Sequence, residues 1–276
     1  MKKLLIILMA CILLITGTVP LSAYTPAQQR SADALNRLGL FLGAGEDVGY
    51  MLDEELTRAQ GLTLLIRVLG LEQEALKGGY VTPFTDVPEW AQPYVGCAYM
   101  LGITKGVSED RFLPDAPLSD AMFLTMILRV LGYRDSGDFS DFVWNNPYEK
   151  AVESGLIPVS EAYTEFTRAE TVEICWNALN AMIVGSEMTL VQYLIQQDVF
   201  TAEAFEEAKI IREYGELPQK TVPSAEEKKP TIVTPIFPSW ILDKDDFEDD
   251  SKDETEDESE DTEKGGLIDE GDINLN

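Results

Sequence analysis

The sequence contains no histidine, and only three of its 276 residues are cysteine. The absence of histidine excludes catalytic triads and dyads with an imidazole base and removes the commonest ligand of zinc sites. Cys11 lies in an N-terminal apolar run, which leaves Cys97 and Cys175, too few for a disulfide framework. We expect both to be buried as small apolar side chains, and we predict no metal and no cofactor.

Basic residues are also scarce, since 21 Lys and Arg stand against 49 Asp and Glu, a formal net charge of −28. A chain of this charge repels the phosphate backbone of nucleic acids, so we expect no nucleic-acid partner. A pair of carboxylates could hydrolyse glycosides, but no spaced pair stands in a recognisable cleft motif. The sequence therefore favours a binding protein, and no enzyme is predicted.

Long apolar runs are missing except at the N-terminus, where two lysines precede the run Leu4–Ile15 and small residues lead up to Ala23. This layout predicts a secretory signal peptide over residues 1–23. The run is too short to span a bilayer and no later stretch could do so, so we expect no transmembrane span in the mature protein. Cys11 stands in a pattern that loosely resembles a lipoprotein cleavage site, but simple secretion is the favoured interpretation.

The C-terminal part differs in composition from the rest of the chain. Residues 217–242 contain five prolines, which exclude a continuous helix and predict a linker. Residues 243–263 are almost wholly acidic with Ser and Thr and have no means of burying apolar surface, so a disordered acidic tail is predicted over residues 243–276. About 190 residues remain for one folded body, which is enough for a sizeable core.

This body contains one helical segment three times, at residues 57–70, 119–132 and 167–180. Each copy opens with a Thr or Ser N-cap and carries apolar residues at helical spacing, which predicts a helix with a broad buried face that includes Cys175. Glutamine or glutamate completes a capping box in copies one and three, whereas Met122 cannot do so in copy two.

A shorter helix is expected before each copy, ending at a glycine suited to the left-handed conformation: Gly39, Gly102 and Gly155. The predicted fold class is all-α, built from helix–loop–helix repeats. Their bounds are residues 31–77, 80–135 and 139–183, followed by a helical extension over residues 187–215.

An arginine stands directly after the N-cap in two copies, as Arg58 and Arg168. A cation there opposes the positive end of the helix dipole, at about 0.3–1 kcal/mol, so its placement favours a site that needs an anion. We predict that the guanidinium and free backbone N–H groups bind a carboxylate or phosphate. An internal ion pair or a solvent-exposed arginine remains the alternative. The second copy has Asp120 at this position, which would repel an anion.

The first two loops each hold a pair of glycines, Gly39 with Gly43 and Gly102 with Gly106. The first of each pair ends a helix and the second makes a turn, but a glycine also lets a ligand approach the backbone closely. The third loop has Val159 in place of the second glycine.

The second copy and its preceding loop contain a series of short motifs: Phe84-Thr85-Asp86-Val87, Trp90-Ala91, Gly102-Ile103, Gly106, Phe112-Leu113-Pro114-Asp115 and Leu118-Ser119. In this order and followed by an apolar helix, they resemble an S-layer homology repeat. Thr167-Arg168-Ala169-Glu170 matches the family's most recognisable tetrapeptide, and the resemblance covers about residues 31–183.

The resemblance implies a pseudo-threefold bundle of three long helices. It also implies non-covalent binding to an anionic secondary cell wall polysaccharide with pyruvate ketals, or to a peptidoglycan-linked glycan, at the wall or surface of a bacterium. By motif position, two arginines would hold the anion and glycines would line the grooves, with Asp86 and Trp90 as further candidates. The candidates are Arg58, Arg168, Gly39, Gly43, Gly102, Gly106, Asp86 and Trp90.

Two candidates and two departures from the family pattern leave alternatives open. Asp86 could cap a short helix, and Trp90 could be a core or a stacking residue, with the core its commoner location. Asp120 and Met122 replace the family's Arg and Glu, so degenerate repeats could serve as a structural scaffold. Residues 187–276 would then contact a protein partner.

Overall fold

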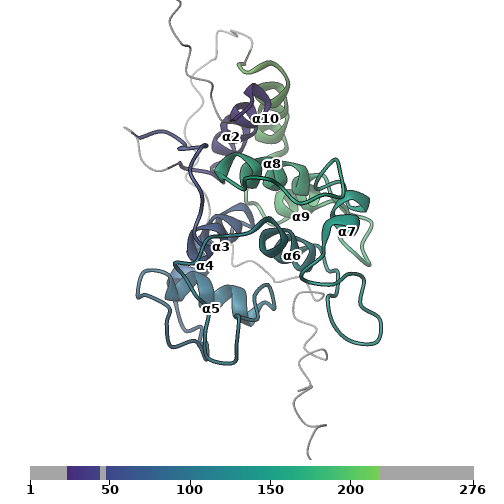
Figure 1. Ribbon diagram of the computed structural model, residues 1–276. Coiled ribbons are helices and arrows are strands. Elements are labelled where there is room, and N and C mark those ends of the chain that lie inside the picture. Colours follow the sequence, from purple (N-terminus) through teal and green to yellow (C-terminus); the bar gives the residue numbers. More distant parts are fainter. Residues whose placement is uncertain (1–23, 44–47, 218–276) are drawn as a thin grey trace, which may run out of the picture. The chain divides into compact units, whose positions relative to one another are not determined.

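The computed structural model describes residues 24–43 and 48–217. These residues form α-helices joined by loops and a few isolated β-bridges, which confirms the all-α prediction (Figure 1). The predicted signal peptide, the acidic tail and all but the first residue of the predicted linker lie outside this part of the chain. Within it, no helix is both long and apolar enough to cross a membrane.

The helices fall into the predicted pattern of short and long segments. In chain order they are α2 (Pro26–Arg37), α3 (Arg58–Val68), α4 (Glu72–Lys77), α5 (Gln92–Met100), α6 (Asp120–Val130), α7 (Tyr148–Glu153), α8 (Arg168–Leu179), α9 (Leu190–Gln196) and α10 (Ala202–Tyr214). The repeated segments are α3, α6 and α8, and the helices before them are α2, α5 and α7. The extension consists of α9 and α10.

The N-caps of the repeated helices are those predicted. Thr57 and Thr167 each form a capping box with the residue three positions on, and Ser119 accepts a hydrogen bond from the Met122 N–H without a reciprocal bond. Gly70 and Gly132 adopt positive φ after their helices, but Asn180 keeps a right-handed φ of −94°. The expected left-handed end is therefore absent from α8.

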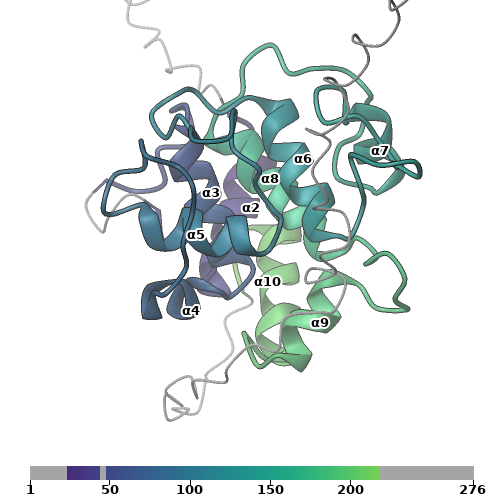
Figure 2. The ribbon, with the colours of Figure 1, turned by 90° about the horizontal axis from the view of Figure 1, so that it is seen from below.

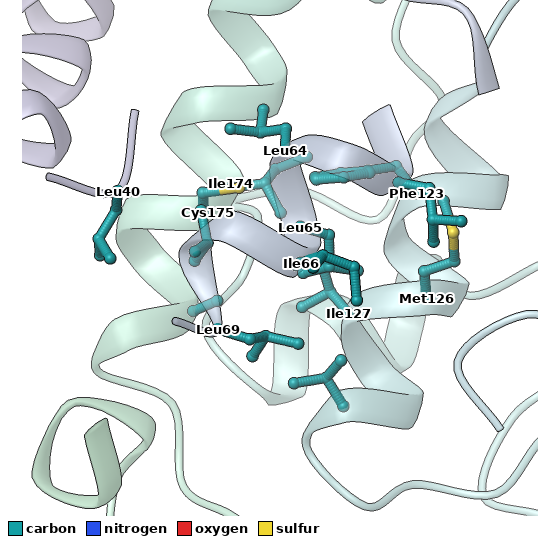
Figure 3. Packing of buried hydrophobic residues seen from close by; sticks show 14 of the residues in the cluster. Leu40, Leu64, Leu65, Ile66, Leu69, Phe123, Met126, Ile127, Ile174 and Cys175 are labelled. Carbon is teal, nitrogen blue, oxygen red and sulfur yellow. The ribbon is translucent and has the colours of Figure 1, made fainter. Parts of the chain in front are cut away.

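The three repeated helices contact one another and share one core. Leu65, Ile127 and Cys175 occupy the same register position in α3, α6 and α8, and each is at most 1% exposed (Figure 3). The predicted burial of Cys175 is thus confirmed, and burial raises the pKa of its thiol far above the ordinary value. A protonated, enclosed thiol is unreactive, so this cysteine is a packing residue.

Each short helix packs on the repeated helix of the preceding unit: α5 on α3, and α7 on α6. Figure 2 shows α4 and α5 on the side of α3, and α7 beside α6. The first short helix, α2, packs on α8, the last repeated helix, and α10 covers α2. Units distant in sequence are therefore joined, and each boundary combines a repeated helix with loops of neighbouring units.

The extension repeats the turn that ends the short helices. Asp198 has a positive φ of +54°, and the following Val199 N–H donates to the Leu194 carbonyl at 3.0 Å. The three short helices end in the same way, each at a glycine of positive φ. The residue after that glycine donates its N–H to the carbonyl five residues back: Leu40 to Leu35, Ile103 to Ala98, and Leu156 to Ala151. The same turn also ends α3 at Gly70 and α6 at Gly132, so it is the common helix-ending turn of the described residues, and α9 and α10 are joined through it.

Asp86 holds a loop in place, and the structure does not support the alternative that it caps a short helix. Its Oδ1 accepts from the Phe112 N–H at 2.9 Å, and its Oδ2 accepts from the Leu113 N–H at 2.9 Å and from Arg111 Nε at 3.1 Å. Burial alone would raise the pKa of Asp86, but these hydrogen bonds outweigh it and hold the pKa below its usual value.

Asp86→Asn should lower the free energy of unfolding by about 2 kcal/mol at pH 7, because hydrogen bonds to a charged acceptor are lost. Because the pKa of Asp86 is lower in the folded than in the unfolded protein, its carboxylate stabilises the fold at pH values above the ordinary pKa near 4. This stabilisation is lost as the pH falls through the folded-state pKa. The difference in the free energy of unfolding between Asp86→Asn and the unsubstituted protein, measured by urea unfolding, should therefore shrink as the pH falls from 7 to 3.

The matched control is Asp115→Asn, which removes the same charge from an exposed side chain in the same loop. A difference for Asp86→Asn that stays constant down to pH 3 would contradict this account.

Candidate functional site

Two grooves of nearly equal size lie between units, with cavity volumes of about 410 and 400 Å³. Both volumes fall in the range of small-ligand sites. We name them the Arg168 groove and the Arg58 groove, after the arginine that each contains. The sequence argument predicted these two arginines as the anion-binding residues, and the structure brings each together with one of the predicted glycines.

The floor of each groove is one repeated helix, used at the same register. The third, sixth, seventh and tenth positions after the N-cap line both grooves. In the Arg168 groove they are Gln60, Thr63, Leu64 and Arg67 of α3, and in the Arg58 groove they are Met122, Thr125, Met126 and Arg129 of α6. The chain thus builds the same site twice, from different units.

The second glycine of each pair forms part of a groove wall. Gly43 lines the Arg168 groove and Gly106 the Arg58 groove, with φ of +71° and +78°. A Cβ on Gly43 would lie 2.7 Å from the Gly49 carbonyl oxygen, and one on Gly106 would lie 2.4 Å from the Phe84 ring, so any side chain is excluded at both positions.

The first glycine of each pair has a different role. Gly39 and Gly102 donate from their N–H groups to the carbonyls of Asn36 and Tyr99 and close the helices before the loops. Neither lines one of the two grooves. Asp86, which fastens the loop after Asp110, also lies outside both linings.

A half-exposed tryptophan borders each groove. Trp90 is 52% exposed in the Arg168 groove, so it is a surface residue and not the core residue that is more usual. Trp144 is 55% exposed in the Arg58 groove and was missed by the sequence argument. The sequence does contain a pattern that could have identified Trp144, because both tryptophans begin the motif Trp-x-x-Pro-Tyr, at residues 90–94 and 144–148.

The guanidinium of Arg58 is enclosed by the protein but not paired with a carboxylate. The residue is 7% exposed, its Nε donates to the Phe112 carbonyl at 2.9 Å, and its carbon Cζ lies 4.8 Å from the centre of the Phe112 ring. Burial lowers the pKa of Arg58, and the more distant Asp86 partly opposes this shift. An arginine stays protonated even so, and a charge held in this way favours an anion beside it.

The guanidinium of Arg168 has fewer partners still. Its Nε is buried and finds no hydrogen-bond acceptor among the residues that the structure describes. Burial lowers the pKa of Arg168, with Glu54 opposing, yet neither arginine forms an ion pair within residues 24–43 and 48–217. Within the described residues, the alternative of an internal ion pair therefore finds no support at either arginine, and Arg58 is not solvent-exposed.

The first backbone N–H groups of the repeated helices are not free, so that part of the expected anion site is wrong. The Arg58 N–H donates to the Ala116 carbonyl and the Arg168 N–H to the Glu54 carbonyl, both at 2.9 Å. The next residues, Ala59 and Ala169, donate to loop carbonyls as well. Any anion in either groove therefore depends on side chains, above all on the guanidinium.

The third boundary is built differently. Asp120, at the position of the two arginines, is 8% exposed and accepts hydrogen bonds from the Tyr163 N–H at 2.8 Å and the Tyr148 hydroxyl at 3.2 Å. Burial and the neighbouring Asp120 raise the pKa of Tyr148. Val159 stands where the other loops have their groove glycine. A carboxylate that belongs to the protein thus takes the place of the cation here.

Comparison with known proteins gives a match in the middle of the chain. The profile of the S-layer homology domain matches residues 83–119, which include Trp90 of one groove and Gly106 of the other. The chain is 36% identical over 112 residues to the surface layer protein of Brevibacillus choshinensis, which is 40% of this chain and 10% of that protein.

Two further relatives agree with this match. The chain is 32% identical over 155 residues to the middle cell wall protein of Brevibacillus brevis, covering 55% of this chain and 14% of the relative. It is 36% identical over 104 residues to a cell surface protein of Thermoanaerobacter kivui, covering 37% and 14%. The chain thus spans only 10–14% of the length of these relatives. The cell-surface or cell-wall location expected from the sequence is confirmed by the domain match and these relatives, and residues 83–119 of the chain are similar to the S-layer homology domain.

Proposed function

We propose that the chain binds an anionic, pyruvylated glycan of the bacterial cell wall non-covalently, through the Arg58 and Arg168 grooves. The observation that carries this proposal is the repetition of one site. Each groove combines an arginine that forms no ion pair with the described residues, a glycine that must lack a side chain, and an exposed tryptophan, on a helical floor of the same register. Packing alone does not require all of these in both places.

The chemistry of each groove suits a sugar that carries a carboxylate. A guanidinium binds a carboxylate through two parallel N–H donors, and a partly desolvated site strengthens that bond. An exposed tryptophan offers a flat apolar face to the C–H face of a sugar ring, as Trp90 and Trp144 would. The role is therefore recognition, and no catalytic group is assigned.

The proposal includes a pseudo-threefold bundle of three diverged repeats with two working grooves. The pairwise contacts of α3, α6 and α8, and the packing of α2 on α8, support this arrangement. At the third boundary, Asp120 is satisfied internally, so we expect no anion binding there.

The structural scaffold remains the second candidate, and Asp120 is the observation that favours it. A protein partner for residues 187–276 stays a prediction, since most of that segment lies beyond the described residues. If the repeats were only a scaffold, substitutions in the two grooves would leave wall binding unchanged.

Arg168→Ala should weaken binding to purified cell walls about 30-fold, because a charge-assisted hydrogen bond of about 2 kcal/mol is lost. Adding Arg58→Ala should release the protein into the supernatant when walls are sedimented. Walls stripped of their secondary polysaccharide should fail to retain even the unsubstituted protein.

Arg134→Ala is the matched control, because it removes one positive charge from an exposed residue outside both grooves. Circular dichroism should show that Arg168→Ala remains folded, since its guanidinium makes no hydrogen bond to the residues that the structure describes. Retention of the double variant on intact walls would refute the proposed anion sites.

Trp90→Ala and Trp144→Ala should each weaken binding about tenfold, because about 50 Å² of apolar contact at 25 cal/mol/Å² is worth about 1.3 kcal/mol. Trp90→Phe keeps an aromatic face and should retain most of the affinity. Equal affinities of Trp90→Ala and Trp90→Phe, measured by titration with wall polysaccharide, would exclude stacking.

A further inference from the structure

The two grooves differ most at the loop residue just before the groove glycine. This residue is Leu42 in the Arg168 groove and Lys105 in the Arg58 groove. Both are accessible, since Leu42 is 57% exposed and the Lys105 side chain is 38% exposed. The residues before them also differ, with Phe41 in one groove and Thr104 in the other. One wall is thus apolar and the other is cationic.

Lys105 is a further cation in the Arg58 groove, and it shares the carboxylate of Asp135 with Arg129. Its Nζ lies 2.9 Å from Ser136 Oγ and 3.5 Å from Asp135 Oδ1. The Asp135 carboxylate is already bound by Arg129, through Nε at 3.1 Å and Nη2 at 2.5 Å. One carboxylate thus faces two cations, so a positive charge remains in excess in the groove beside that of Arg58.

The Arg168 groove carries one positive charge fewer in excess than the Arg58 groove. Its two cations are Arg67 and Arg168, and Arg67 Nε is paired with Glu72 at 2.7 Å. The Tyr94 hydroxyl donates to the same Glu72 oxygen at 3.1 Å, which keeps that carboxylate beside the groove. Among the residues that the structure describes, one positive charge is in excess here, against two in the Arg58 groove.

We propose that the two grooves recognise different units of the glycan, an inference that rests on the proposed function. The Arg58 groove takes a unit with two negative charges, held by Arg58 and Lys105. The Arg168 groove takes a unit with a single carboxylate and an apolar substituent, such as the methyl group of a pyruvate ketal against Leu42. Because unlike grooves would fix the order of units along a strand, the chain would read the direction of the glycan as well as its charge.

The test uses two probes, a hexosamine with one pyruvate ketal and the same hexosamine with a phosphate monoester. The monoester carries between about 1.5 and 2 negative charges near pH 7. Arg168→Ala leaves the Arg58 groove as the proposed site, and Arg58→Ala leaves the Arg168 groove. By calorimetric titration, the Arg58 groove should prefer the monoester on the order of tenfold, and the Arg168 groove should prefer the ketal.

The exchange of the two loop residues gives matched variants. Lys105→Leu, made in the Arg168→Ala protein, should remove the preference for the monoester, whereas Leu42→Lys, made in the Arg58→Ala protein, should create one. Both side chains are accessible, so circular dichroism should show unchanged folding. Each exchange should also change the salt dependence of monoester binding, because a charge contact is lost or gained.

The outcomes separate this inference from the proposed function. Binding of both probes with a preference that Lys105→Leu does not change would overturn the difference between the grooves and leave glycan binding intact. Binding of neither probe, together with unchanged retention of the Arg58→Ala, Arg168→Ala protein on walls, would overturn both. Loss of the monoester preference in the Lys105→Leu variant, together with its gain in the Leu42→Lys variant, supports the inference.

Discussion

The arrangement of the units depends on how the first backbone N–H groups of α3 and α8 are satisfied. They donate to loop carbonyls of neighbouring units, as in the bonds from Arg58 to Ala116 and from Arg168 to Glu54. These bonds tie unit to unit and fix the first helical residue at the boundary, so its side chain enters the space between units. A guanidinium that is largely enclosed there, and that forms no ion pair with the described residues, makes an anion the favourable occupant.

Much of the fold could be predicted from the sequence because it depends on local rules. The capping residues Thr57 and Thr167, and the core position of Cys175, follow from helical periodicity and from the chemistry of helix ends. The grooves depend on which loop of one unit faces which helix of another, which local rules do not specify. Trp144 was therefore overlooked, the contacts of Asp86 with the loop around Phe112 were not foreseen, and backbone N–H groups were expected to be free.

The acidic composition of the chain is compatible with an anionic ligand because the relevant charges are local. The formal net charge is −28, but charges of exposed residues are screened over about 8 Å at physiological salt. Inside the grooves, cations such as Arg58, Lys105 and Arg168 lie close to the position that a ligand would occupy. The net charge would slow the approach to the wall more than it would weaken the bound state.

The central claim is that the chain makes one site twice and replaces the third with an internal carboxylate, Asp120. Its most direct test is the stoichiometry of binding, measured by calorimetric titration of residues 24–276 with a short, single-unit fragment of the purified wall polysaccharide. The account predicts two fragments bound per chain. A stoichiometry of three would show that the Asp120 boundary also binds, and the absence of binding would contradict the account as a whole.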